Sequence, residues 1–249
     1  MPKQTLCLHE WRIWKLYGEQ RECKMRSILS LLMQSRRRDL LKQEEQSTQD
    51  KILSSAKQEF LEKGFLNASL RNIVKNAGVT TGAFYGYYDS KEALFAALVE
   101  EQAAYILALF NRTIDDFEKL PGETQTERMV DTSEECLAKM LDYIYEHYDA
   151  FKLLVGCAQG TPYENFSHQL AVREEDSTYT YIETLAGMGH PVEKIHKNLI
   201  HIISSSLFAG IFEVVVHDMP KEEAKEYLVQ FHRFHAAGWS ELMGIRFGA

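Results

Sequence analysis

Residues 69–95 of this chain read SLRNIVKNAGVTTGAFYGYYDSKEALF, and this stretch decides the fold. Ser69 can cap a short helix that ends near residue 76, and Thr80 can cap a second one over residues 81–87. Between the two helices lies a tight connection, where Gly78 can take a left-handed turn because it has no Cβ. The pattern therefore predicts a helix-turn-helix.

The helix-turn-helix lies between two longer helical patterns. Upstream, an apolar residue recurs every four positions from residue 52 to residue 60, and Gly64 is placed to end that helix in a left-handed cap. Downstream, Asp89 and Glu92 have the spacing of a capping box and open a long helix. The predicted core of this helix trio contains Leu70, Ile73, Val79 and Phe84.

The rest of the chain is also expected to be helical. Pro121-Gly122 breaks the long helix, and five further stretches follow at 128–148, 150–157, 162–188, 192–217 and 221–243. With 14 Gly and 5 Pro in 249 residues, a turn-rich all-β fold is excluded. We expect an all-α fold: a three-helix module with a helix-turn-helix over residues 48–92, followed by a helical bundle over residues 93–249.

Residues 1–47 have no sustained apolar period and are expected to form a poorly ordered N-terminal extension. A start at Met33 would leave a short basic arm, so we expect part of the first 32 residues to be absent from the native product. No continuous apolar run approaches the ~18 residues that a membrane helix requires. We therefore expect no membrane partner, and the four scattered cysteines favour a reducing cytoplasm.

The net charge of −8 is unevenly distributed. Residues 1–47 carry ten Lys and Arg against six Asp and Glu, residues 48–92 carry six against five, and residues 93–249 carry twelve against twenty-five. Residues 48–92 could bind a polyanion such as DNA although the rest of the chain is acidic, because a nucleic-acid binder needs positive charge only on the surface that meets the nucleic acid. The alternative is that the acidic part of the chain only keeps the protein soluble.

The second helix of a helix-turn-helix enters the DNA major groove with its N-terminus first. Threonine hydroxyls there can reach base edges or phosphates, and two glycines let the backbone approach closely. A lysine in the first turn of the next helix suits a phosphate. The candidate DNA-binding residues are Ser69, Thr80, Thr81, Gly82, Ala83, Tyr85, Gly86, Tyr87 and Lys91.

From residue 48 to residue 94 the chain resembles, without a gap, the DNA-binding domain of TetR/AcrR-family transcriptional regulators. The resemblance rests on the spacing of Gly64-Phe65, Ala77-Gly78-Val79-Thr80, Phe84-Tyr85 and Ser90-Lys91-Glu92. Two positions depart from the family's pattern: Val74 stands where a small residue is usual, and Gly86 replaces a commoner polar side chain. Beyond residue 94 the resemblance is one of architecture only.

The resemblance implies a homodimer that binds a near-palindromic DNA operator, usually as a repressor, and that a small-molecule effector releases. The last two helices would form the dimer interface; the alternative from spacing alone is that both belong to a monomer core. The candidate interface residues are Leu199, Ile203, Ser206, Gly210, Val214, Leu228, Phe231, His235, Trp239 and Leu242.

The effector domain is rich in aromatic residues that could line an apolar pocket. An aromatic stripe at helical spacing is more often core than ligand site, so each candidate competes with plain packing. Those on inward stripes of different helices are Phe110, Tyr143, Phe166, Tyr181 and Phe208.

Catalytic and metal-binding patterns are missing from the sequence. His232 and His235 lie three apart on one helix, but no ligand set completes a metal site, and the run Glu174-Glu175-Asp176 is interpreted as a solvated helix face. We expect no enzyme activity, no metal and no cofactor. Two other hypotheses remain: an all-α enzyme or carrier with an incidental helix-turn-helix, and an adaptor whose module no longer binds DNA.

Overall fold

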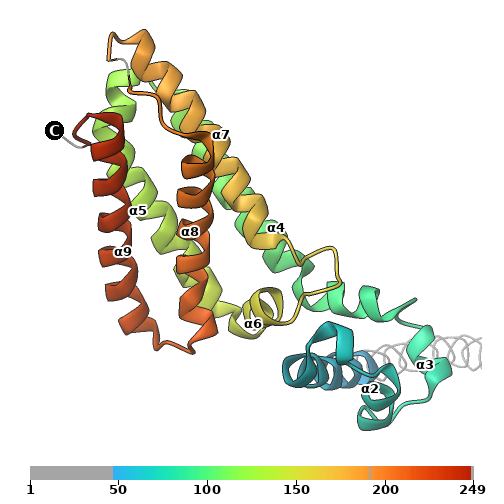
Figure 1. The fold of residues 1–249 in the computed structure, drawn as a ribbon. Helices are drawn as coiled ribbons and strands as arrows, with labels where there is room; N and C mark the ends of the chain where they lie inside the picture. Colours follow the sequence, from blue (N-terminus) through green and yellow to red (C-terminus); the bar gives the residue numbers. More distant parts are fainter. Residues whose placement is uncertain (1–46, 191, 248–249) are drawn as a thin grey trace, which may run out of the picture. The chain divides into compact units, whose positions relative to one another are not determined.

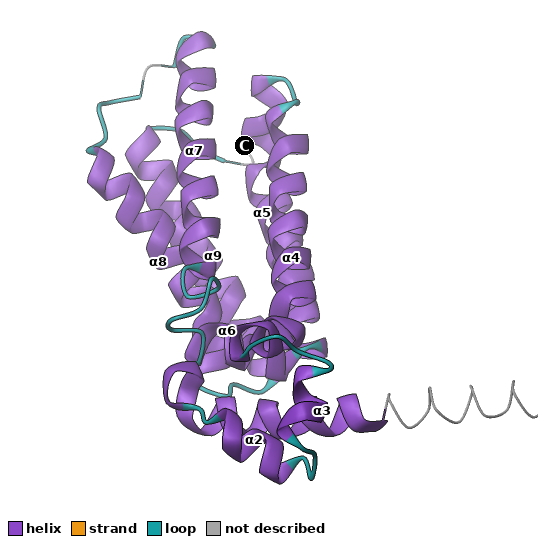
Figure 2. Ribbon diagram, turned by 90° about the vertical axis from the view of Figure 1, so that its right-hand side faces the viewer, coloured by secondary structure: helices purple, strands orange, loops and turns teal. Residues whose placement is uncertain are grey.

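The computed structural model describes residues 47–190 and 192–247, and these residues form helices and loops without a strand (Figures 1 and 2). The predicted all-α fold is confirmed. The chain divides into two compact units, Met1–Lys51 and Ile52–Ala249, and the second is described below. Most of the predicted extension lies outside the described residues, and the division at residue 92 stays a prediction.

The helix-turn-helix forms where the sequence predicts it. The chain is helical over residues 47–67, here called the first helix, and continues with α2 (Leu70–Asn76) and α3 (Thr81–Tyr85). Ser69 and Thr80 cap α2 and α3 through their side chains, and Gly78 has a φ of 68°. α3 ends two residues earlier than expected, because the Gly86 N–H turns back to the Ala83 carbonyl.

The bundle contains six helices among the described residues: α4 (Lys91–Glu118), α5 (Gly122–Glu146), α6 (Tyr148–Gly156), α7 (Phe166–Gly187), α8 (Lys197–Val216) and α9 (Lys221–Met243). α8 packs along α7 and also contacts α9, while α5 lies between α4 and α9 (Figure 1). α6 is a short helix that touches α4, α5, α7 and α8. The core of the bundle therefore lies between α4, α5, α7, α8 and α9.

Several predicted helix starts are wrong. α5 starts at residue 122 rather than 128, directly after Pro121, and three other starts differ because of local caps and turns. Ser90, not Asp89, caps α4 by accepting a hydrogen bond from the Ala93 N–H at 3.1 Å. α7 starts at residue 166 rather than 162, because the Thr161 hydroxyl organises a turn over residues 158–165. α8 starts at residue 197 rather than 192, because the His196 imidazole caps it.

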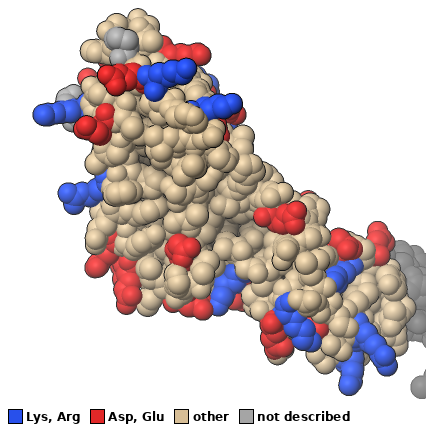
Figure 3. Space-filling view, viewed as in Figure 1, with Lys and Arg blue, Asp and Glu red and all other residues tan. Residues whose placement is uncertain are grey.

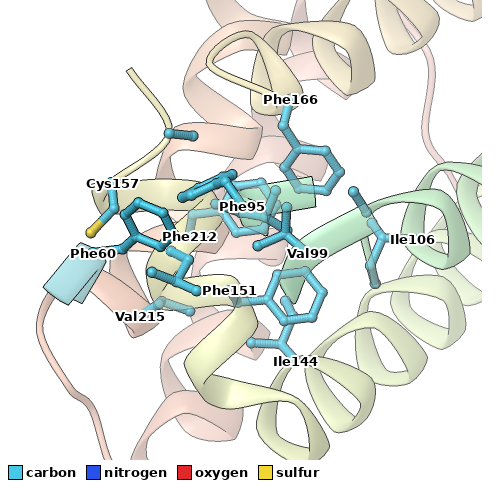
Figure 4. Packing of buried hydrophobic residues seen from close by; sticks show 14 of the residues in the cluster. Phe60, Phe95, Val99, Ile106, Ile144, Phe151, Cys157, Phe166, Phe212 and Val215 are labelled. Atoms are coloured by element: carbon cyan, nitrogen blue, oxygen red, sulfur yellow. The ribbon is translucent and has the colours of Figure 1, made fainter. Parts of the chain in front are cut away.

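One continuous apolar core joins the helix-turn-helix to the bundle (Figure 4). Phe60 of the first helix and Phe95 of α4 are both fully buried, with ring centroids 5.2 Å apart. Phe95 also packs edge-on against Phe65, and the Phe65 N–H donates to the Cys157 carbonyl just after α6 at 2.9 Å. α4 is thus anchored in the module at one end and in the bundle at the other.

Two described helices, α4 and α8, are long and apolar enough to cross a membrane by length and composition. Polar residues interrupt the apolar stretches of α4 and α8. Neither helix therefore contains the continuous apolar run by which a membrane helix is predicted from the sequence. Phe95 and Ile106 of α4, and Phe208 and Phe212 of α8, are buried in the core. The core helix of a soluble protein gives the same signal as a membrane span, so this observation is weak evidence for a membrane.

Candidate nucleic-acid interface and bundle cavity

The helix-turn-helix is held by its two caps and by a buried centre. The Thr80 hydroxyl accepts from the Ala83 N–H at 3.1 Å, and the Ser69 hydroxyl accepts from the Asn72 N–H at 3.4 Å. Ile73 of α2 and Phe84 of α3 are fully buried and fix the angle between the helices. The outer surface of α3 is thereby held in one orientation.

Sequence reasoning missed a buried carboxylate under α2. Glu59 of the first helix is 4% exposed and accepts hydrogen bonds from the Ser69 N–H at 3.0 Å, Asn72 Nδ2 at 3.3 Å and Lys63 Nζ at 2.8 Å. The Lys63 hydrogen bond leads the causes that hold the pKa of Glu59 below its ordinary value. The signal was Glu59 itself, a charged residue beside Phe60 on the apolar stripe of the first helix.

We expect Glu59→Ala to lower the free energy of unfolding by about 2 kcal/mol at pH 7, because the half-buried donors at the start of α2 lose their acceptor. Since the folded pKa is below the unfolded value of 4.5, the stability from the Glu59 carboxylate is present above pH 4.5. It is lost as the pH falls through the folded pKa. Urea unfolding between pH 7 and pH 3 measures this, with the exposed Glu62→Gln as control. A Glu59→Ala protein as stable as the control would contradict the role.

The structure exposes most of the predicted DNA-binding residues on one surface. Thr80, Thr81, Gly82 and Gly86 are exposed, and Tyr85 is 54% exposed although it follows the fully buried Phe84. Ala83, Tyr87 and Ser69 are half-buried. Small side chains and hydroxyls of this kind can contact base edges in a major groove.

Positive charge accompanies this surface. Arg71 and Lys75 of α2 are exposed, and Lys and Arg side chains lie over the α2 and α3 end of the unit in the view of Figure 3. Neither residue was among the sequence candidates. Because α2 lies beside α3, these side chains are placed to meet the sugar–phosphate backbone that flanks a groove.

Lys91 has a structural role that its sequence position did not reveal. Its ammonium group donates to the carbonyls of Phe65 at 2.7 Å, Ala68 at 3.2 Å and Leu66 at 3.4 Å, and it lies 4.4 Å from the centroid of the Phe65 ring. These carbonyls belong to the end of the first helix, where helical partners run out. The predicted phosphate contact of Lys91 stays a prediction.

A cavity of about 130 Å³ lies inside the bundle between α4, α5, α7, α8 and α9, and is called here the bundle cavity. Its walls are mostly apolar, with aromatic rings from Phe110, Phe117, Tyr181, Phe208, Trp239 and Phe247. Its polar groups are Thr113, Thr132, Ser133, Cys136, Glu174, Ser177, Thr178, His232 and His235. A partly open apolar pocket with a few convergent polar groups is typical of a small-molecule site.

Three of the five predicted ligand-binding residues line this cavity. Phe110 and Phe208 meet edge to face with centroids 5.0 Å apart, and the Tyr181 hydroxyl is hydrogen-bonded to Thr126 at 2.8 Å. Tyr143 instead stacks on Tyr105, and Phe166 packs in the core against Phe151 and Phe212, so neither contributes to the wall. The position of an aromatic residue on the inward face of a helix predicts that its ring is buried. It does not predict whether the buried ring lies against the cavity or against other side chains.

The cavity wall contains titratable side chains whose surroundings differ from those predicted from the sequence. Glu174 is half-buried and lines the cavity rather than lying on a fully solvated face, and burial raises its pKa to about 7. His232 and His235 are each 7% exposed, and burial lowers the pKa of both imidazoles. His232 Nε2 is hydrogen-bonded to the Ser133 hydroxyl at 2.6 Å. Burial also raises the pKa of the Cys136 thiol.

The predicted dimer residues divide into an inner and an outer group. Gly210, Val214, Leu228 and His235 are buried inside the protomer, where they cannot reach a partner in this conformation. Leu199 and Ser206 are exposed, and Ile203, Phe231, Trp239 and Leu242 are half-buried. Sequence spacing missed the apolar residues that project furthest from α8 and α9: Ile202 at 60%, Val216 at 54%, Val229 at 45% and Phe234 at 74% exposed.

Among the described residues no group of three His, Cys, Asp or Glu side chains is placed to hold a metal ion. The bundle cavity contains a carboxyl group, two imidazoles and several hydroxyls, which can form hydrogen bonds with a ligand.

A sequence model of the family described as "Bacterial regulatory proteins, tetR family" matches residues 52–98. The match covers the helix-turn-helix and the start of α4. The chain is also 35% identical over 77 residues to the HTH-type transcriptional regulator UidR of Escherichia coli K12, and 38% identical over 65 residues to the HTH-type transcriptional repressor NemR of the same strain. These matches cover 31% and 26% of this chain.

The chain spans only 39% of the length of UidR and 33% of the length of NemR, so these likenesses bear on the DNA-binding module. Among solved structures, the fold is similar to that of SmeT, the repressor of the Stenotrophomonas maltophilia multidrug efflux pump SmeDEF. The TM-score is 0.51 at 20% identity, covering 77% of this chain and 91% of SmeT. At that identity the likeness concerns the fold.

Proposed function

We propose, from the premise that this chain belongs to the TetR family of transcriptional regulators, that it is a dimeric repressor released from a near-palindromic operator by a small molecule. The observation that carries the proposal is the exposed surface of α3, with its hydroxyls, glycines and Tyr85, held by the buried Phe84. Regulators of this family are not enzymes, which removes the alternative of an enzyme with an incidental helix-turn-helix.

DNA recognition is assigned to both helices of the module. Thr81, Gly82 and Ala83 of α3 would meet base edges, while Arg71 and Lys75 of α2 would meet phosphates on either side of the groove. A cytoplasmic protein with these groups would bind duplex DNA in a strongly salt-dependent way, because each neutralised phosphate releases counterions.

Two copies are proposed to associate through the outer faces of α8 and α9. The support is the exposure of large apolar side chains on these two helices, Leu199, Ile202, Val229 and Phe234, because exposed apolar surface often marks an interaction site. A two-fold axis would place the same patch on both subunits and would repeat α3 at two operator half-sites.

The effector is proposed to act from the bundle cavity through α4. This helix contributes Phe110 and Phe117 to the cavity wall, and its start carries Phe95, which packs on the first helix. A ligand that shifts α4 would change the orientation of the module. By linkage the ligand can weaken DNA binding only by the ratio of its affinities for the two states.

Selection from a random duplex library by the full chain, at a stated salt concentration, tests the proposal. We expect a near-palindromic site, with Thr81→Ala changing the base preference at one symmetric position by about 1–3 kcal/mol. The exposed Thr180→Ala, in the bundle, is the matched control and should leave the preference unchanged. Without an enriched sequence from a folded protein, the regulator proposal fails and the adaptor hypothesis is favoured.

A further inference from the structure

We propose that the bundle cavity takes a small apolar amine, a molecule with about one ring of bulk whose protonated nitrogen binds the Glu174 carboxylate. This inference rests on the proposed function, since it specifies the effector class of the same cavity. It is carried by the size of the cavity, the signs of the charges around it and the aromatic rings in its wall.

The volume of the cavity limits the bulk of the ligand. The bundle cavity measures about 130 Å³. An apolar protein cavity of roughly 150 Å³ accommodates a benzene molecule. A single ring with a short side chain therefore matches the volume of the cavity.

The charges around the cavity disfavour an anionic ligand. No Lys or Arg is among the described residues that line the bundle cavity. Arg173, the neighbour of Glu174 on α7, is held away by two carboxylates of α4: Asp115 at 2.8 Å and Glu118 at 3.1 Å. The two imidazoles of the wall favour their neutral forms, because burial lowers the pKa of His232 and of His235. The charge of Arg173 lowers the pKa of Glu174 by less than burial raises it, and no cation lies in the described cavity wall, so an anionic ligand would meet the Glu174 carboxylate there.

Glu174 is the group that a cation would satisfy. Within residues 47–190 and 192–247 the Glu174 carboxylate has no hydrogen-bond donor, although its neighbour Glu175 is hydrogen-bonded to His201 at 2.9 Å. Leaving a carboxylate in an apolar space costs free energy, and this is why the pKa of Glu174 is raised. A bound ammonium group would supply both the charge and the donors that the site lacks.

The aromatic wall supplies the rest of the site. Phe110, Phe208, Tyr181 and Trp239 come from four different helices and all border the cavity. Their rings can cover the apolar body of the ligand, and their negative faces attract an ammonium group within about 6 Å. A neutral ligand of the same shape would use the apolar contacts but would leave Glu174 unpaired.

Calorimetric titration of the full chain with three probes of similar shape tests the inference: benzylamine, benzyl alcohol and benzoate. At pH 8 we expect benzylamine to bind about tenfold or more tightly than benzyl alcohol, because a charge-assisted hydrogen bond replaces a neutral one. Benzoate should bind most weakly. Equal binding of the amine and the alcohol, or no binding of any probe, would overturn the proposed ligand class.

Glu174→Gln separates this interaction from the shape of the cavity. The variant keeps the volume and should bind benzyl alcohol as the unsubstituted protein does, which also reports a correct fold, while its preference for benzylamine disappears. Glu175→Gln is the matched control on the next residue and should keep the preference. A preference that persists in Glu174→Gln would overturn the proposal.

The pH dependence gives a second readout. Between pH 6 and pH 8 the affinity for benzylamine should rise about tenfold in the unsubstituted protein, as a carboxyl group titrating near pH 7 ionises. The other titratable or charged groups near Glu174 in the described part of the chain are Cys136, Arg173, Tyr181, His232 and His235. They remain in Glu174→Gln, so a rise that survives in this variant would come from them and would contradict the assignment to Glu174.

The outcomes for the two proposals are distinguishable, because the probes are titrated without DNA. Benzylamine binding without selection of a duplex would keep the ligand class and remove the repressor proposal. Selection of a palindrome by a protein that prefers benzoate or benzyl alcohol would keep the repressor proposal and remove the amine.

Discussion

Phe84→Ala is expected to lower the free energy of unfolding of the DNA-binding module by about 3–5 kcal/mol, the usual cost of removing a buried aromatic ring. Phe84 is fully buried and packs against Tyr88 with ring centroids 5.9 Å apart, so its removal leaves a cavity under α3. Thermal unfolding followed by circular dichroism measures the loss. DNA binding should disappear together with the fold of the module.

Tyr85→Ala is the matched substitution on the next residue. Because Tyr85 is 54% exposed, we expect stability within about 0.5 kcal/mol of the unsubstituted protein and a clear loss of operator affinity. The pair separates the two faces of a five-residue helix. Equal destabilisation by both substitutions would mean that α3 is not oriented as described, with Phe84 inward and Tyr85 outward.

Lys91→Ala is expected to lower the free energy of unfolding by about 1.5–3 kcal/mol. It is also expected to lower the affinity for DNA. The reason for the lower stability is that the ammonium group of Lys91 donates to three carbonyls at the end of the first helix, and the substitution removes this shared donor. Urea unfolding of the variant measures this contribution in the absence of DNA.

The salt dependence of operator binding separates the two roles of Lys91. If the side chain also neutralises a phosphate, the slope of log affinity against log salt should fall by about one unit in Lys91→Ala. The matched control is Lys75→Ala, an exposed lysine of α2 that should change the slope without changing stability. An unchanged slope in Lys91→Ala would assign this residue to the fold alone.

The helix-turn-helix was predictable because its determinants are local in the sequence. Ser69 and Thr80 cap their helices by accepting from the backbone N–H three residues later, and Gly78 adopts the left-handed turn by itself. Each of these interactions lies within a few residues of chain. The exception is the capping residue of α4, which is Ser90 and not the predicted Asp89. A difference of one residue is usual when the end of a helix is assigned.

The bundle cavity was only partly predictable. Phe110, Tyr181 and Phe208 were named from their inward stripes, but the same argument also named Tyr143 and Phe166, which pack elsewhere. An apolar residue on an inward face is buried in either case. Whether it meets another side chain or an empty space depends on the distances between helices that are far apart in the sequence.

The sequence by itself determined the all-α fold, the helix-turn-helix and the residues that α3 presents, because caps, turns and apolar periods act over one or two helical turns. Only the tertiary structure decided what Glu174 and Lys91 do. Successive residues on a helix point about 100° apart, so Glu174 faces the cavity while Glu175 meets His201. Which direction leads into a cavity is set by α4, α5, α8 and α9, and their positions follow from the packing of the whole core.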